Sequence, residues 1–219
     1  LSRASARISH NRNHFPEGHG VMKFIKENSY NMFKMFLDQI AMTVFGTMLS
    51  FATLKNEGLL LASSIFSILF YLMLLYTVGW DIGARDKIRI DGGRMKPFPM
   101  KGFLIALGAN TLNILLALLI GIGVMIDTEW SNGMALICNA VARLAEGMYL
   151  GVISILEHKL FENPGIRDVW WWFLIIVIPS LFTGWLSYFM GTRDLSVSRI
   201  LGIKRRDDAG NLTGKNRMK

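Results

Sequence analysis

The chain has 219 residues, of which 52% are apolar, and it carries a formal net charge of +8 at pH 7. Its charged residues collect near the ends and in one internal stretch, leaving apolar runs of about 20 residues, which excludes an ordinary soluble domain. Basic residues beside such runs indicate membrane topology and contact with anionic lipid, so we do not expect nucleic-acid binding.

The first 21 residues are polar and lack the apolar centre of a signal peptide. Because the chain opens on Leu1 and a methionine stands at Met22, we expect translation to start at Met22 and residues 1–21 to be a tail outside the native fold. We expect a membrane domain over residues 22–190 and a basic cytoplasmic tail over residues 191–219.

Apolar runs predict an all-α, polytopic membrane protein with four spanning helices, over residues 35–54, 59–80, 103–126 and 170–190. At about 1.5 Å per residue, each run is long enough to cross about 30 Å of hydrocarbon. Only residues 55–58 join the first two runs, so we expect these helices to be antiparallel neighbours.

Two of these spans carry polar or small residues that recur on one helical face. In the first span they are Gln39, Thr43, Gly46, Ser50 and Thr53, and in the third they include Asn110 and Asn113. Small residues allow close approach of helices, and asparagine forms hydrogen bonds between them, so packing is the default interpretation.

The most charged stretch, residues 81–96, is expected to be a cytoplasmic loop between the second and third spans. Its Asp91-Gly92-Gly93 sequence predicts a turn, because glycine accepts a positive φ. Basic residues here and in the tail are the candidate contacts to anionic lipid or to a partner: Arg85, Lys87, Arg89, Arg94, Lys204, Arg205 and Arg206.

A fifth apolar segment, residues 134–156, carries Asn139, Arg143 and Glu146 along one helical face. With four spans, 20 of the 24 Lys and Arg residues lie on one side of the membrane; a fifth span splits them 14 against 9 and buries Arg143. The positive-inside rule therefore favours an external interfacial or re-entrant segment over a fifth span, with both chain termini cytoplasmic.

This candidate polar cluster has two interpretations. If the segment is embedded, Glu146 is the expected partner of Arg143, and the pair with Asn139 marks a substrate or proton path. If the segment lies on the surface, the same residues form the polar face of an interfacial helix.

The sequence contains no phosphate-binding loop, no His-Glu-x-x-His motif, no nucleophile elbow and no Cys/His cluster. Its single cysteine, Cys138, excludes an intrachain disulfide. We therefore assign no catalytic residue, metal ligand or cofactor from the sequence.

The leading functional hypothesis is a non-enzymatic subunit or accessory protein of the cell membrane, of a size and charge pattern that suit a bacterial inner membrane. Its partners would be the bilayer with anionic inner-leaflet lipid and a partner membrane subunit or a second copy of the chain. The alternative is a small oligomeric permease or channel-forming subunit, motivated by Arg143, Glu146, Asn110, Asn113 and Pro179. A lipid-modifying enzyme is the third hypothesis.

Overall fold

The structure is a computed structural model that describes residues 18–160 and 170–195. Within these ranges the regular elements are all helices, as predicted. They are α1 (Gly18–Thr53), α2 (Glu57–Asp91), α3 (Lys101–Ala109), α4 (Thr111–Ile126), α5 (Glu129–Ala145), the 3₁₀ turn η1 (Gly147–Tyr149), α6 (Leu150–Leu160) and α8 (Trp172–Thr192). Because α1 begins at Gly18, the predicted tail of residues 1–21 overlaps the first turn of a helix.

Three described helices are long and apolar enough to cross a membrane, namely α1, α2 and α8. Two further pairs meet the same test only when taken together, α3 with α4 and α5 with η1 and α6, and these are bent by 60° and 79°. The described chain thus has three to five candidate spans. The prediction of four continuous spans is more than the structure confirms, because only three of the described helices qualify unbroken and the third predicted span is broken at Asn110.

Helices α1 and α2 form the antiparallel hairpin predicted from their short connection. Asn56 begins α2, and its side-chain oxygen accepts a hydrogen bond from the Leu59 backbone N–H at 3.2 Å. Near the turn the hydroxyl oxygens of Thr53 and Ser63 lie 3.2 Å apart, which joins the two helices. We call the end of the molecule that holds residues 54–56 the turn end, and the end that holds residues 92–100 the loop end.

The charged stretch predicted as a loop is mostly helical, because α2 continues through it to Asp91. Hydropathy marks where a helix leaves an apolar environment, whereas a helix continues as long as its backbone hydrogen bonds do. The ion pair of Asp81 with Arg85, one helical turn apart, supports this extension. The predicted turn is confirmed, since α2 stops at Gly92 and Gly93 has a φ of +68°.

Helix α8 packs along α2 in parallel orientation through small residues. Gly79 lies against Ser187, and Gly83 lies against Tyr188 and Gly191, so the contacts advance together along both helices. The α3–α4 bend lies at Asn110, whose side-chain amide donates to the Ala106 carbonyl at 2.8 Å. This asparagine satisfies a carbonyl at the end of α3, and α4 departs in a new direction.

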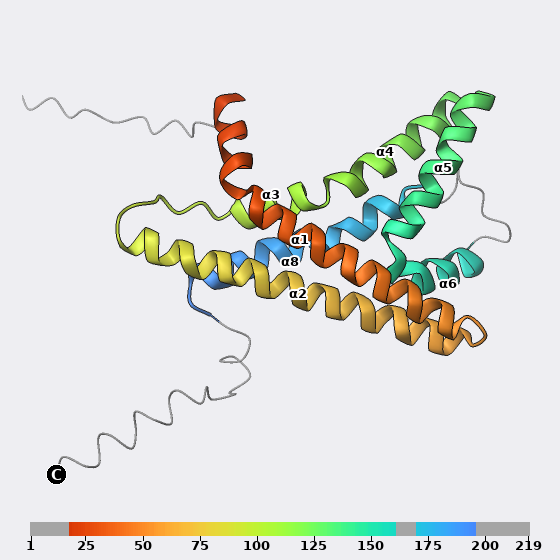
Figure 1. Cartoon of the computed structure of the whole chain (residues 1–219), viewed down its shortest axis with the longest axis horizontal. Helices are drawn as coiled ribbons and strands as arrows, with labels where there is room; N and C mark the ends of the chain where they lie inside the picture. The colour runs from red at the N-terminus through yellow and green to blue at the C-terminus, as the bar shows by residue number, and fades with distance from the viewer. Residues whose placement is uncertain (1–17, 161–169, 196–219) are drawn as a thin grey trace, which may run out of the picture.

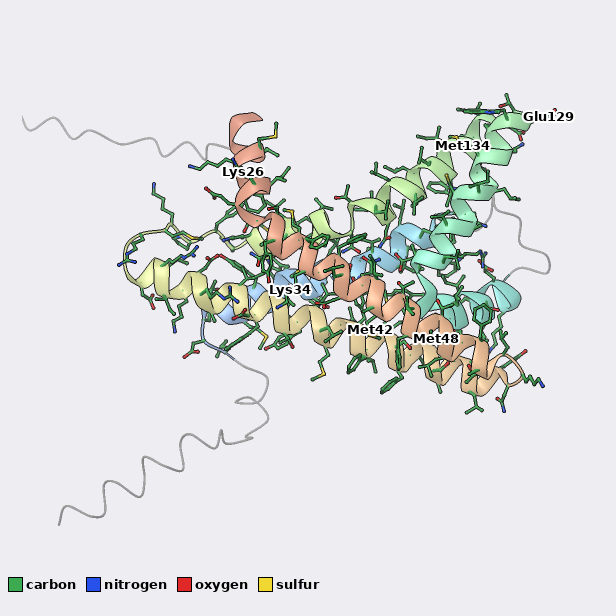
Figure 2. The ribbon with its side chains drawn as sticks, viewed as in Figure 1. Lys26, Lys34, Met42, Met48, Glu129 and Met134 are labelled. Atoms are coloured by element: carbon green, nitrogen blue, oxygen red, sulfur yellow. The ribbon has the colours of Figure 1, made fainter. Side chains whose placement is uncertain are left out.

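Helices α4 and α5 form a second hairpin whose tip lies toward the turn end (Figure 1). Gly121 of α4 lies against the Trp170 ring, which precedes α8, and a Cβ added at Gly123 would lie only 2.9 Å from the Cβ of Ala135. Figure 2 shows Glu129 at this tip, while Lys26 and Met48 lie toward opposite ends of α1.

From the tip, α5 runs inward to the middle of α1, where the Thr43 hydroxyl donates to the Ala145 carbonyl at 2.6 Å. The chain then breaks, and Gly151 at the start of α6 donates its N–H to the Ser64 hydroxyl at 2.9 Å, close to the beginning of α2. The α5–η1–α6 segment therefore enters and leaves at the turn end.

Candidate functional site

The loop end is organised around Asp86, a carboxylate that is buried although it lies in the most charged stretch of the chain. Lys101, the first residue of α3, places its Nζ 2.6 Å from Asp86 Oδ2, and the Tyr188 hydroxyl of α8 donates to the same oxygen at 3.1 Å. Arg89 approaches the other carboxylate oxygen at 3.8 Å. This carboxylate therefore accepts hydrogen bonds from α3 and α8 and has a second cation nearby on its own helix.

A polar pocket of about 320 Å³ opens beside Asp86. Its wall on α1 consists of Glu27, Asn28 and Asn31, and its opposite wall includes Asp86, Arg89 and Lys101. Amides, cations and carboxylates of this kind suit a small polar or anionic group at the level of lipid headgroups.

Of the predicted basic contacts, Arg85 and Arg89 are exposed, with 63% of each side chain accessible, and Arg94 is exposed too. Lys87 is partly covered and lies 3.9 Å from Asp194. The structure thus gathers these four residues at the loop end. Lys204, Arg205 and Arg206 lie outside the described residues.

The second candidate site is the break between α5 and α6. Gly46 of α1 lies directly against the Met148 backbone, and Gly147 lies against Thr47, where an added Cβ would be 2.9 Å from the Thr43 carbonyl oxygen. A side chain at either glycine would collide with the opposing backbone or hydroxyl. The small residues of the predicted α1 stripe therefore allow the break to dock against the bundle.

The predicted pairing of Arg143 with Glu146 is wrong. Arg143 instead forms an ion pair with Glu157 of α6, at 2.7 Å. The prediction assumed one continuous helix, but α5 ends at Ala145 and Glu146 leaves helical geometry with φ −107° and ψ 29°. The 79° bend then brings α6 back beside Arg143 and directs Glu146 elsewhere.

Glu146 is buried at this break, with 3% of its surface accessible. Tyr71 of α2 and Tyr149 of η1 are its electrostatic neighbours. Gln39 belongs to the same face of α1 as Thr43, one turn away, and is buried as well. The Gln39 Oε1 and the Tyr149 hydroxyl have no hydrogen-bond partner, and neither has Asn139 Oδ1 further along α5.

Sequence reasoning missed Asp86, Lys101 and Tyr188 as one group. The three residues are far apart in the chain, and Asp86 stands among exposed charges. The available signal was Gly83, three residues before Asp86, because a glycine in a helix marks a close approach that buries its neighbours.

Within residues 18–160 and 170–195, no three His, Cys, Asp or Glu side chains come together as metal ligands. The chain matches no protein-family model, and comparisons with curated proteins and with solved structures give no match either. The function of the chain is therefore inferred from the two sites themselves.

Proposed function

We propose that the chain is a non-enzymatic component of a membrane assembly and that its charged loop end is the contact surface. The supporting observation is the asymmetry of this end: Asp86 is turned inward and paired with Lys101, whereas Arg85 and Arg89 are exposed. A buried carboxylate that is held by donors from two other helices is suited to holding helices together rather than to proton transfer. The outward surface is basic and suits an acidic partner surface.

In the proposed topology α1, α2, the bent α3–α4 pair and α8 cross the membrane, and the α5–η1–α6 segment is re-entrant. The 79° bend and the course of α6 back toward the turn end support this arrangement (Figure 1). It places the loop end and the C-terminal tail in the cytoplasm, in agreement with the charge distribution.

Cysteine labelling of intact cells tests the topology, in a Cys138→Ala background. We expect external labelling of Lys55→Cys, at the turn end, and no external labelling of Lys96→Cys or Gly214→Cys. External labelling of Gly214→Cys would overturn the proposed topology, because the tail would then lie opposite the α2–α3 loop.

Crosslinking in native membranes tests the contact surface. We expect the wild-type chain to yield a stoichiometric protein partner and the double variant Arg85→Glu/Arg89→Glu to lose it. The matched control is Lys55→Glu, which changes a charge at the turn end and should retain the partner. If the wild type captures only anionic lipid, or no partner at all, the assembly proposal fails.

A second candidate function is a small permease, favoured by the broken α5–α6 segment and the buried Glu146. Broken helices inside a membrane protein place backbone and polar groups around a substrate position. Solute or ion flux into liposomes should then depend on Glu146, with Glu146→Gln reducing it at least tenfold. Absence of flux in the wild type, or equal flux in the variant, would exclude this candidate.

A further inference from the structure

The break between α5 and α6, together with the adjoining turn of α1, carries oxygen atoms that lack positive partners. Glu146 forms no ion pair among the described residues, since Arg143 is taken by Glu157. The Gln39 Oε1 and the Tyr149 hydroxyl are buried and unpartnered. The carboxylate and the amide oxygen can only accept hydrogen bonds. The Tyr149 hydroxyl and the Gln39 amide nitrogen can donate, but both are neutral, so the group contains no positive charge.

The titratable neighbours do not supply that charge. Tyr71 of α2 and Tyr149 of η1 are phenols, and Asp38 of α1 is a further carboxylate near Tyr71. Ser180, the neighbour of Tyr71 on α8, is not titratable at ordinary pH. In addition, α5 ends at Ala145 and directs the negative end of its helix dipole toward Glu146.

We infer that Glu146, Gln39 and Tyr149 form a binding site for one small monovalent cation, filled by Na⁺ or by a proton on the carboxylate. Hard cations prefer oxygen ligands, and a buried carboxylate without a counter-charge is strongly disfavoured. Broken helices use their exposed carbonyls and C-terminal ends to coordinate Na⁺ or H⁺ in this way. Cation binding at this site does not depend on the assembly proposed above.

Hydroxyl groups connect this site to the turn end. Along α1, Thr47, Ser50 and Thr53 follow Thr43 on the face turned toward α2 and the break, and the buried Ser50 hydroxyl has no partner. Ser63 and Ser64 continue the series on α2. These hydroxyls place further oxygen atoms on both helices between the site and the turn end.

The test uses the full chain, purified in detergent, with two measurements. Na⁺ binding is followed by the rise in melting temperature between choline chloride and NaCl at constant ionic strength. Proton binding is followed by the infrared C=O stretching band of a protonated carboxylic acid, recorded as pH is varied. A saturable Na⁺ effect that Glu146→Gln removes supports Na⁺ as the occupant. A carboxylic acid band that Glu146→Gln removes, without a Na⁺ effect, supports the proton.

Two further variants make the result independent of whether Glu146→Gln folds. Tyr149→Phe keeps the ring and removes one oxygen, so it should weaken Na⁺ binding roughly fivefold, the effect expected for one neutral contact, or shift the carboxylic acid band. Glu129→Gln is the matched control, because it removes an exposed carboxylate at the tip of α5, at the opposite end of that helix from the break, and should leave both signals in place. The inference is overturned if the wild type shows neither signal, or if Tyr149→Phe and Glu146→Gln leave both unchanged.

Discussion

Asp86 and Glu146 are both buried carboxylates, yet their surroundings differ in one respect. Asp86 is surrounded by donors, with Lys101 at 2.6 Å and the Tyr188 hydroxyl at 3.1 Å. Glu146 forms no ion pair among the described residues, its electrostatic neighbours are the phenols of Tyr71 and Tyr149, and the nearest arginine along the chain is paired with Glu157. Burial alone therefore does not define a carboxylate's role. The supply of donors separates a carboxylate that joins helices from one that remains available to a ligand.

The largest effect is expected when Asp86 loses its cation. Lys101→Met should lower the free energy of unfolding by about 3 kcal/mol, because a buried carboxylate is left without a counter-charge. Chemical denaturation in detergent, followed by circular dichroism, measures it. The double variant Asp86→Asn/Lys101→Met should recover most of the loss. A single variant as stable as the wild type would show that Asp86 is not held by Lys101.

An effect of intermediate size is expected where the break meets α1. Gly46→Ala places a methyl group against the Met148 backbone and should cost about 1–3 kcal/mol, the usual range for overpacking. The control is Gly133→Ala on α5, where an added Cβ would meet no other atom within 4 Å. Because alanine favours the helix more than glycine does, this variant should be as stable as the wild type or more stable. Equal effects in the two variants would mean that the break is not docked there.

Neutralising the two carboxylates compares the sites directly. Glu146→Gln should change the unfolding free energy by less than about 1 kcal/mol, because no ion pair is lost and a neutral amide is cheaper to bury. Asp86→Asn should cost about 2 kcal/mol, because it leaves Lys101 largely buried and unpaired. The same denaturation experiment measures both, and a reversed order of the two effects would refute the comparison.

The smallest effect is expected at the exposed ion pair. Arg85→Ala should change stability by less than about 0.5 kcal/mol, because Arg85 and Asp81 form a solvent-exposed pair one turn apart. Thermal melts of the variant and the wild type at low and high salt measure this change in stability. A loss above about 1 kcal/mol would assign Arg85 a role in holding the loop end together.

The sequence allowed the α1–α2 hairpin and the turn at Gly93 to be predicted, because a short connection and a pair of glycines are local signals. It did not reveal that α2 continues to Asp91, because hydropathy shows which residues prefer an apolar environment and does not show where a helix ends. The break at Asn110 was missed for a similar reason, since asparagine also occurs inside packed helices.

Among the candidate site residues, Glu146 is predicted to be either buried or part of an interfacial polar face, and the structure buries it, whereas its predicted pairing with Arg143 is wrong. The spacing of Arg143 and Glu146 has meaning only in a continuous helix, and the bend after Ala145 removes it. The Asp86 group depends on how α2, α3 and α8 meet, which no local pattern contains.

The length of α2, 35 residues, determines how far the loop end lies from the middle of the membrane. At about 1.5 Å per residue the helix is about 52 Å long, against about 30 Å for the hydrocarbon layer and 40–45 Å with the headgroups. Even at a tilt of about 40° a helix of this length is longer than the hydrocarbon layer is thick. In the proposed topology α2 therefore carries the exposed arginines out of the hydrocarbon, to the level of the headgroups, where they can meet either lipid or the surface of a partner.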